Sequence, residues 1–434
     1  MEREQTATSA SGAQTRREFL RRSAATAATA AVTAGMPQIA LGQTKGANDR
    51  LGVGFIGCGG RQGAHLQAIH WLKNHGKEAV DLVAVCDVYR PRMQGTAKHY
   101  KAKGYTDHRE LLKDSNVDVV AIATPDHHHA PQAIDAFEAG KDVYCEKPFT
   151  HWRQFELAKK AAQIAQRKNR VFQLGTQGMS DSTWHQAAKL IKDGLIGQPI
   201  HAECGYFRVG DWGERGMPIP DRNVKPGGDL NWEAFLGDSP KRPFDVSRFF
   251  RWRMYEDYSG GPVTDLFPHS FTPVVYMLGV GLPSLAVATG GKFRYPDREV
   301  PDTFNMLVDY PQKATVAVLG TQGNNHSGTG DHGAGGRSPI VRGWDGTLTF
   351  RGNQIVFTPA AGCKKKPRQF KIERGENLVD HWKNLLDGIR KRDPKTNSPF
   401  ELAYYVQSAL NMAMLSLRNG KTARFDAKKQ EIVI

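Results

Sequence analysis

Short apolar runs alternate with helical segments over residues 51–174, and this alternation constrains the fold more than any other feature of the chain. Val- and Ile-rich runs predict strands at 51–56, 82–86, 117–123, 142–145 and 170–174. Apolar residues at helical spacing predict helices at 63–75, within 92–103, at 131–139 and at 152–168. Strands that alternate with helices in this way predict a doubly wound parallel sheet, an α/β Rossmann domain, which we place at residues 49–173.

The pattern changes after Gly175, where polar and apolar residues alternate in longer runs. A helix at 184–193 and a strand at 200–207 are followed by expected strands at 284–294, 304–310, 315–321, 346–351 and 354–358. These runs predict an α+β domain with a large, mostly antiparallel open sheet over residues 174–434. We also expect two amphipathic helices near the C-terminus, at 378–391 and 401–419. This C-terminal segment, residues 378–419, can pack back on the first domain.

Two segments of this second part lack a clear pattern. The first is a Gly-, Pro- and Trp-rich stretch over residues 210–253. The second is the glycine-rich loop 323–336, which contains His326 and His332. No acidic residue stands at metal-ligand spacing from these histidines, so we interpret the loop as mobile or as a rim of the site, with metal binding as the less favoured alternative.

The first 42 residues have the composition of a targeting signal. Paired arginines at 16–17 precede Phe-Leu, an Ala/Thr-rich run over 23–35 and small residues at 40 and 42. The run is too short for a bilayer, which needs about 20 residues. The order is typical of a twin-arginine signal peptide. It predicts a periplasmic or otherwise extracytoplasmic protein with no stable membrane insertion after cleavage; a basic amphipathic tail is the alternative.

Charge and cysteine content narrow the class of protein. The chain of 434 residues carries a formal net charge of +15, and removing the five Arg and three Glu of residues 1–42 leaves +13. Its five cysteines form no C-x-x-C pair, so no disulfide framework is implied. No helix-turn-helix, zinc finger or aromatic-basic platform supports binding of nucleic acid. The basic excess therefore favours an anionic sugar or polymer, with solvated surface charge as the alternative.

A glycine-rich turn stands directly between the first strand and the first helix. The spacing is G-x-G-x-x-x-G, at the place where backbone N–H groups and a helix N-terminus can bind a pyrophosphate. Asp87 ends the second strand, where a carboxylate accepts hydrogen bonds from ribose hydroxyls and repels a 2′-phosphate. These residues predict that the chain binds NAD rather than NADP. The alternative is that the turn has only a structural role. The expected contacts are Gly57, Cys58, Gly59, Gly60, Arg61, Gln62, Gly63 and Asp87.

Two further segments follow strands, and we expect both at the carboxyl edge of the sheet, where ligands bind. One runs from Thr124-Pro125 through three consecutive histidines to His129, and the other is Glu146-Lys147-Pro148. Adjacent histidines diverge in direction and no cysteine completes a tetrahedron, so we predict no metal. Asp265 and His269 are four residues apart, so on a helix they would share a face and the carboxylate could orient the imidazole.

These motifs together resemble the Gfo/Idh/MocA family, named for glucose-fructose oxidoreductase, inositol dehydrogenase and a rhizopine-catabolism protein. The resemblance covers essentially the whole chain after the signal. It implies a Rossmann domain joined to an open-sheet domain that often forms the contact in a homodimer or homotetramer. It also implies catalytic roles for Lys147 and His269, with Asp265 in support. Cofactor contacts are implied at Thr124, Pro125, His129, Glu146 and Lys147.

The chain departs from the family pattern at two positions. Thr272 stands where the family often has Asp, which bears on substrate contacts. Asp126 replaces a frequent Asn.

The resemblance and the signal together predict an exported NAD-dependent oxidoreductase acting on a secondary hydroxyl of a sugar, sugar derivative or cyclitol. His269 would take the hydroxyl proton while Lys147 stabilises the oxygen. Little free NAD is available outside the cytoplasm, so we expect a tightly bound cofactor recycled in the site. One alternative is an NAD-dependent glycoside hydrolase or lyase acting by transient oxidation and elimination. Others are a dehydrogenase with an unidentified electron acceptor and a non-catalytic sugar-binding or regulatory protein.

Overall fold

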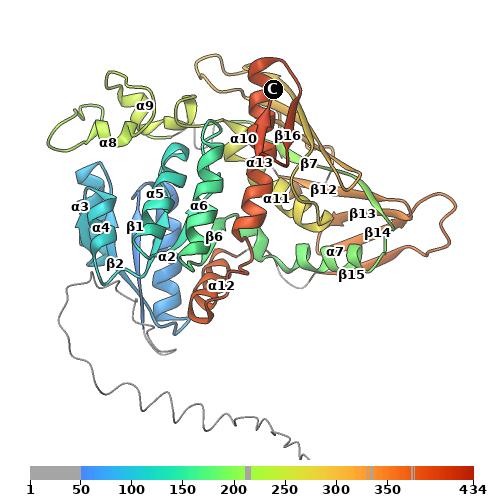
Figure 1. Ribbon diagram of the computed structural model, residues 1–434, viewed down its shortest axis with the longest axis horizontal. Coiled ribbons are helices and arrows are strands. Elements are labelled where there is room, and N and C mark those ends of the chain that lie inside the picture. Colours follow the sequence, from blue (N-terminus) through green and yellow to red (C-terminus); the bar gives the residue numbers. More distant parts are fainter. Residues whose placement is uncertain (1–49, 211–216, 330, 333–335, 373–374, 376) are drawn as a thin grey trace, which may run out of the picture. The chain divides into compact units, whose positions relative to one another are not determined.

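The computed structural model describes residues 50–210, 217–329, 331–332, 336–372, 375 and 377–434 (Figure 1). All of them belong to one compact unit, residues 45–434. The expected signal peptide and parts of the expected loops at 210–253 and 323–336 lie outside the described residues.

The first sheet has six parallel strands in the order β3-β2-β1-β4-β5-β6. Its strands are β1 (Leu51–Ile56), β2 (Val80–Cys86), β3 (Lys103–Tyr105), β4 (Val119–Ile122), β5 (Asp142–Glu146) and β6 (Phe172–Gly175). Its helices are α2 (Gly60–Asn74), α3 (Arg90–Tyr100), α4 (His108–Lys113), α5 (Asp126–Glu138) and α6 (Phe155–Arg167). The strand order reverses between β1 and β4, and ligands bind beside such a reversal in open α/β sheets. The Rossmann-type sheet predicted from the sequence is confirmed.

Helix α5 begins five residues earlier than expected, at Asp126 rather than Pro131. Proline favours the first position of a helix, which is why the sequence suggested a start there. In the structure Pro131 lies inside the helix, where it cannot donate to the carbonyl of His127. That carbonyl accepts instead from Gln154 Nε2 at 3.1 Å, so the helix continues without an unpaired group at this point.

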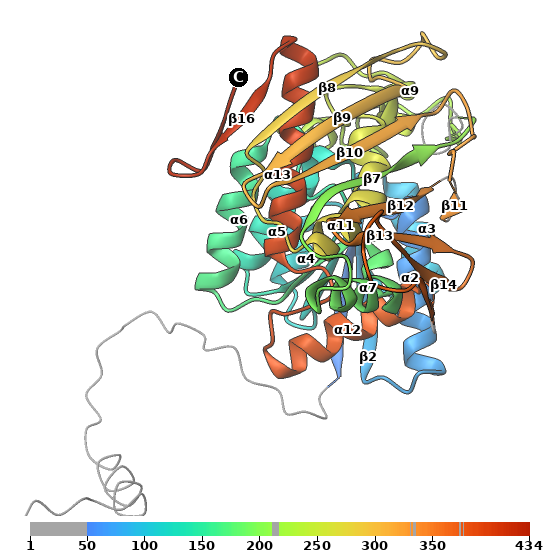
Figure 2. The same ribbon diagram turned by 90° about the vertical axis from the view of Figure 1, so that its right-hand side faces the viewer.

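The second sheet has eleven strands, ten of them in the order β15-β14-β13-β12-β7-β10-β9-β8-β16-β17, with β11 paired to β12 (Figure 2). Its described ladders are antiparallel except for β7 with β10, which confirms the mostly antiparallel sheet. Its strands are β7 (Pro199–Phe207), β8 (Leu285–Gly291), β9 (Thr303–Tyr310), β10 (Ala314–Thr321), β11 (Asp331–His332), β12 (Gly336–Gly343), β13 (Gly346–Arg351), β14 (Gln354–Pro359), β15 (Arg368–Lys371), β16 (Ala423–Asp426) and β17 (Glu431–Val433).

Strand β12 occupies a central position that the sequence analysis did not assign to a strand. Pro339 argues against a central strand, because proline cannot donate to the ladder. The register with β7 shifts between Arg337 and Ile340, so a bulge accommodates the proline.

The helices of the second part flank this sheet or follow it in sequence. They are η1 (Gln177–Ser180), α7 (Ser182–Lys192), α8 (Trp232–Leu236), α9 (Val246–Phe250), η2 (Trp252–Met254), α10 (Pro262–Asp265), α11 (Phe267–Leu278), α12 (Leu378–Lys391) and α13 (Phe400–Asn419). No helix in the described ranges is long and apolar enough to cross a bilayer.

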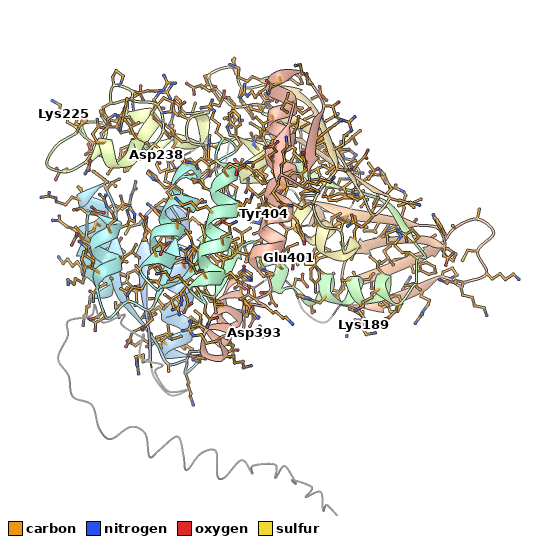
Figure 3. All side chains as sticks on the ribbon, viewed as in Figure 1. Lys189, Lys225, Asp238, Asp393, Glu401 and Tyr404 are labelled. Carbon is orange, nitrogen blue, oxygen red and sulfur yellow. The ribbon has the colours of Figure 1, made fainter. Side chains whose placement is uncertain are left out.

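The two closing helices contribute to the core of the parallel sheet. Trp382 of α12 is fully buried in a cluster with side chains of β1, β2 and α2. On the opposite side, Phe400 of α13 stacks on Phe172 of β6 with ring centroids 3.9 Å apart. Tyr404, labelled in Figure 3, stacks on Phe155 of α6 at 5.4 Å. The C-terminal helices therefore cover surfaces that the first 125 residues of the fold leave apolar.

Residues 217–259, which we call the arm, form an apolar cluster of their own with Tyr89 (Lys225 and Asp238 mark the arm in Figure 3). Backbone bonds join the arm to the loop after β2: Arg90 N donates to Asp229 O at 2.7 Å, and Asn231 N donates to Val88 O at 3.0 Å. The arm therefore lies against the carboxyl end of the parallel sheet.

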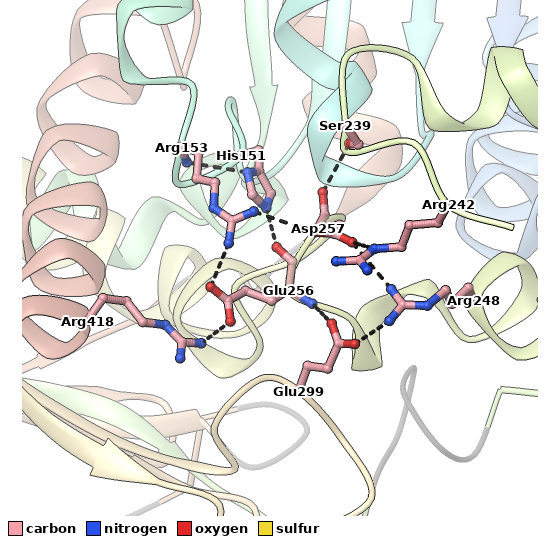
Figure 4. Close-up of polar contacts among 9 residues, drawn as sticks. All are labelled: His151, Arg153, Ser239, Arg242, Arg248, Glu256, Asp257, Glu299 and Arg418. Carbon is pink, nitrogen blue, oxygen red and sulfur yellow. Dashed lines mark hydrogen bonds and ion pairs between the residues drawn. The ribbon is translucent and has the colours of Figure 1, made fainter.

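Ion pairs fix the other end of the arm (Figure 4). Asp257 accepts from Arg242, from Arg248 at 3.4 Å and from Arg153 at 3.5 Å. Glu256 pairs with Arg153 and with Arg418 of α13, both at 2.8 Å. Since Arg153 follows β5, these pairs connect the arm to both the parallel sheet and the closing helix.

Candidate active site

A cavity of about 1290 Å³ lies between the carboxyl ends of the parallel strands, the arm and helices α10 and α11. It is larger than the roughly 300–1,000 Å³ of sites for single small ligands. The cavity has room for a dinucleotide together with a second molecule. Most of the residues predicted to act or to bind line it; they are Gly57, Cys58, Gly59, Gly60, Arg61, Gly63, Asp87, Thr124, Pro125, His129, Glu146, Lys147, Asp265 and His269.

The glycine-rich turn provides an open backbone surface in the wall of the cavity. Gly57 has φ +85°, and a Cβ there would lie 2.9 Å from the carbonyl oxygen of Ala123, so only glycine fits without strain. At Gly59, Gly60 and Gly63 a Cβ would meet no protein atom within 4 Å. Because α2 begins at Gly60, its N-terminus faces the same space. The turn therefore fits a pyrophosphate approaching the backbone closely.

Gln62 departs from its expected role, and Asp87 has a second role besides facing the cavity. The side chain of Gln62 is fully buried, and its Nε2 donates to Ala121 O at 3.4 Å, so it faces the sheet rather than the cavity. Asp87 does line the cavity, but its carboxylate also accepts from Cys58 N at 2.8 Å and from Tyr89 N at 2.9 Å. Arg92 Nη1 lies 3.4 Å from the same carboxylate. Asp87 thus fixes the turn as well as facing the site.

A chain of buried hydrogen bonds holds Glu146. Its Oε1 accepts from Arg61 Nε at 2.8 Å and from His65 Nε2 at 2.9 Å. Trp382 Nε1 donates to His65 Nδ1 at 3.0 Å, so the neutral ring carries its proton on Nε2. Burial alone raises the pKa of Glu146, but the charge of Arg61 and the bond from His65 outweigh it and hold the pKa well below its usual value. Helix α12 therefore helps to position the residue before Lys147.

Lys147 forms the centre of a second polar group. Its Nζ donates to Asp265 Oδ1 at 2.8 Å and also to the backbone carbonyl of Asp265. Arg253 Nε donates to the same Oδ1 at 3.2 Å. Burial by itself raises the pKa of Asp265, but the charges of Lys147 and Arg253 outweigh it and hold the pKa well below its usual value. The carboxylate is therefore ionised and fixes the lysine.

The expected pairing of Asp265 with His269 is wrong. Helix α10 ends at Asp265 and α11 begins at Phe267, with Pro268 in its first turn, so the two residues do not share one continuous helix. The carboxylate turns to Lys147 and Arg253 instead.

His269 lines the wall of the cavity. Among the described residues its ring makes no hydrogen bond to a protein atom, and its centroid lies 6.4 Å from that of Tyr206. Burial, followed by the charge of Lys147, lowers the pKa of His269 to about 3. The ring is therefore neutral at physiological pH. Thr272, one turn further along α11, is fully buried and lies away from the cavity lining.

The three consecutive histidines have structural partners. His127 and His128 both donate to Phe235 O of the arm, at 2.8 and 2.7 Å. His129 lies between Pro148 O at 2.6 Å and Thr124 O at 2.8 Å, so it joins the two loops that follow β4 and β5. The part of the chain that the structure describes contains no cluster of three His, Cys, Asp or Glu side chains able to hold a metal ion.

Sequence reasoning missed three charged residues of the site. Arg208 directly follows β7, and Arg253 lies in η2; both line the cavity. Asp126, noted only as a departure from the family pattern, is buried beside this group. Burial raises the pKa of Asp126 to about 7, against the charge of Arg253. A charge immediately after a strand was an available signal for Arg208, whereas the stretch around Arg253 offered no periodicity.

The first part of the fold is a parallel sheet with a glycine turn where its strand order reverses. The second part is an open sheet that contributes charged side chains to the same cavity. Together they define the class of two-domain nucleotide-dependent oxidoreductases. Two family models match the chain: "Oxidoreductase family, NAD-binding Rossmann fold" over residues 51–176 and "Oxidoreductase family, C-terminal alpha/beta domain" over residues 180–286. The chain belongs to this family, Gfo/Idh/MocA, and its cofactor is NAD.

Curated relatives match part of the chain. An inositol 2-dehydrogenase of Salmonella paratyphi B is 34% identical over 168 residues, which cover 37% of this chain and 46% of the relative. An alpha-N-acetylgalactosaminidase of Shewanella oneidensis is 29% identical over 175 residues, covering 37% of this chain and 36% of the relative. The chain thus spans less than half the length of these relatives. The structure of an NAD-binding oxidoreductase from Klebsiella pneumoniae shares the fold, with a TM-score of 0.63, 22% identity and coverage of 86% of this chain and 99% of that one.

Proposed function

We propose that the protein oxidises a secondary hydroxyl of a sugar, sugar derivative or cyclitol with NAD. The observation that carries this proposal is the shared cavity, which is lined both by the glycine turn and by Lys147, Asp265 and His269. The similarity to an inositol 2-dehydrogenase supports a polyhydroxylated substrate.

The chain offers groups that match each part of NAD. The open backbone at Gly59 and Gly60 and the start of α2 would hold the pyrophosphate, and Asp87 would accept from a ribose hydroxyl. The loops held by His129 would contact the remainder; their cofactor-binding residues are Thr124, Pro125, Glu146 and Lys147. When bound, NAD supplies the acceptor for the hydride that leaves the substrate carbon.

Lys147 and His269 have different roles at the substrate hydroxyl. Asp265 holds the ammonium of Lys147, which donates a hydrogen bond to the substrate oxygen and stabilises the charge that develops there. His269 is neutral and can accept the hydroxyl proton. Because an imidazolium beside Lys147 is disfavoured, His269 passes this proton on to solvent.

We further propose that the protein is exported by the twin-arginine pathway and retains its cofactor for recycling within the site. The signal-like sequence of residues 1–42 supports export. The arm supports retention, because its backbone bonds to the loop after β2 and the histidine bonds to Phe235 O keep it against the cavity.

A second candidate is an NAD-dependent glycosidase, which oxidises transiently, eliminates the leaving group, adds water and reduces the product. The similarity to an alpha-N-acetylgalactosaminidase favours this candidate. Product analysis separates the two: a released aglycone without net NADH indicates glycoside cleavage, and an oxidised sugar indicates dehydrogenation.

The test begins with protein purified from the exported fraction and denatured to identify released nucleotide. Recovery of NAD supports retention, and its absence contradicts it. Sugars, cyclitols and glycosides are then screened for NADH formation and for cleavage products. Lys147→Ala and His269→Ala should each abolish turnover while NAD still binds, whereas Lys189→Ala, an exposed residue of α7, should retain activity. Full activity in the first two variants would refute the assigned roles. Light scattering would check the predicted homodimer or homotetramer.

A further inference from the structure

Three histidines of the nucleotide-binding part donate hydrogen bonds to backbone carbonyls of the arm. His127 and His128, in the first turn of α5, both donate to Phe235 O, at 2.8 and 2.7 Å. His151, which follows β5, donates to Glu256 O at 3.0 Å near the end of the arm (Figure 4). We call these three histidine side chains the latch.

The latch requires neutral imidazole rings. A carbonyl oxygen can only accept, so each ring carries its proton on Nε2. Nδ1 of His151 accepts from Arg153 N at 3.3 Å, and Nδ1 of His127 is buried without a hydrogen-bond partner among the described residues. A second proton on either ring would therefore break a bond or bury an unpaired charge. The rings of His127 and His128 have centroids 4.0 Å apart, so two charges there would also repel each other.

The protein environment keeps the latch neutral while the arm is in place. Burial lowers the pKa of His128 and of His151 to about 4, and it lowers the pKa of His127 well below its usual value. Arm side chains contribute to this burial, since the rings of Phe235 and Tyr258 lie 5.7 and 5.0 Å from the ring of His127. Once the arm moves away, the histidines regain water and the ordinary pKa of about 6.5. Acid therefore favours the open arm, because the open form binds more protons.

The neighbours of the latch do not drive opening between pH 7 and pH 5. The charged and titratable groups that act on the latch come from α5 itself, α4, the segment after β5 and the arm; they are His108, His129, Arg153, Asp238 and Asp257. Burial raises the pKa of Asp257, but the bonds and charges of its arginines outweigh it and hold the pKa below its usual value, outside this range. Asp126, next to His127, does titrate, because burial raises its pKa to about 7. A raised pKa acts in the opposite sense, so Asp126 opposes opening by acid.

The arm forms part of the wall of the cofactor cavity. Phe235, Phe249 and Phe250 of the arm line the same cavity as the glycine turn and Asp87. NAD bound at the turn would therefore be partly enclosed by the arm. We propose that acid opens the arm through the latch and thereby releases the retained NAD. This inference rests on the proposed function, because it names how retention at the same site is regulated.

The first test measures opening of the arm in the full chain without any ligand. Hydrogen exchange at pH 7, 6 and 5 is expressed as protection factors, so that the intrinsic effect of pH on exchange cancels. One histidine whose pKa is about 4 in the closed form and about 6.5 in the open form makes opening about 20-fold more frequent at pH 5 than at pH 7. We expect protection over residues 217–259 to fall by about 20-fold or more, while β1 keeps its protection.

Glutamine variants separate the latch from other effects of acid. A variant with His127→Gln, His128→Gln and His151→Gln keeps three N–H donors that cannot gain a charge, so the pH dependence of the arm should disappear. The matched control is His70→Gln, an exposed position on α2 outside the cavity lining, which should follow the wild type. A fall of less than about threefold in the wild type would overturn the inference, as would an unchanged pH dependence in the triple variant. If the triple variant does not fold, His128→Gln alone must remove about 20-fold of the effect, and failure to do so overturns the inference.

The second test follows the cofactor. Protein loaded with NAD is washed, and the nucleotide that passes a filter is timed at each pH. The release rate should rise by the same factor as the opening of the arm, and the triple variant should hold NAD at pH 5. Opening of the arm without faster release would overturn the inference. The proposed function fails separately, if no polyol reduces NAD or if Lys147→Ala is fully active; the exchange measurement depends on neither.

Discussion

Trp382→Phe should destabilise the protein and weaken NAD binding, although Trp382 lies on a C-terminal helix. The indole is fully buried, stacks on Tyr144 with centroids 4.6 Å apart, and donates to His65 Nδ1 at 3.0 Å. Phenylalanine keeps the aromatic stack but leaves the buried nitrogen of His65 without a donor. An unsatisfied buried acceptor costs about 1–3 kcal/mol. The smaller phenyl ring also loses packing contacts, which costs less than the roughly 3–5 kcal/mol of truncating a tryptophan to alanine. We therefore expect the free energy of unfolding to fall by about 2–4 kcal/mol in total.

The effect on binding follows from the position of the His65 ring. Its Nε2 donates to Glu146 and its Nδ1 accepts from the indole, so two hydrogen bonds hold the ring in place. Loss of the indole donor removes one of them, so the ring is held less firmly and its hydrogen bond to Glu146 at the cavity wall weakens. Urea unfolding and calorimetric titration with NAD measure the two effects.

The matched control is Trp71→Phe, since Trp71 on α2 is 47% exposed. It should change stability by less than about 0.5 kcal/mol, as surface substitutions usually do. Equal stabilities of the two variants, or unchanged NAD affinity in Trp382→Phe, would refute the reasoning.

Three further predictions concern the cavity. Gly57→Ala should destabilise the fold by about 1–3 kcal/mol because Gly57 has a positive φ. Gly59→Ala should unfold like the wild type but bind NAD more weakly in calorimetry. Similar unfolding midpoints in the two variants would contradict this prediction. Asp87→Ser should narrow the preference for NAD over NADP, measured as the ratio of their Kd values, because it removes a carboxylate and frees Arg92. Asp126 has a folded pKa raised from 3.8 to about 7, so its contribution to stability is complete below pH 4 and is lost as the pH rises through 7. Between pH 4 and 8 the Tm of Asp126→Asn should therefore rise relative to the Tm of the wild type. Arg253, Lys147 and Asp265 face position 126 in both proteins. Parallel profiles of Tm against pH in the two proteins would contradict this titration of Asp126.

The parallel sheet could be predicted from the sequence because each of its strands is marked by a short, continuous run of residues. A strand such as Leu51–Ile56 is buried along its whole length, so its apolar run is continuous, and the glycine turn must follow it directly. The resemblance to the family, which short motifs carry, predicted Lys147 and His269 as site residues, and both line the cavity. The assignment failed for β12, where a bulge at Pro339 compensates for a residue that local rules exclude from central strands.

The partners of the site residues could not be read from the sequence, because they are distant in the chain. Lys147 and Asp265 are separated by 118 residues, and His65 and Trp382 by 317. Spacing of four residues suggested a pair of Asp265 and His269, but Pro268 in the first turn of α11 places a helix boundary between them. Gln62 was likewise assigned from its position in the turn, while its side chain follows the inward face of α2.

The contribution of α12 and α13 to the first sheet has a consequence for the timing of folding during synthesis. Gln173 on β6 and His381 on α12 are hydrogen-bonded although they are 208 positions apart in the sequence. At about 5–20 residues per second, the ribosome needs roughly 10–40 s to make that stretch. Throughout this interval the emerging nucleotide-binding half exposes the apolar surfaces that Trp382 and Phe400 later cover. The residues that line the cavity end at His269, but the bond from Trp382 that helps to hold His65 and Glu146 forms only after α12 has been made. We therefore expect nascent chains arrested before residue 378 to bind chaperones more strongly, and NAD more weakly, than the full chain.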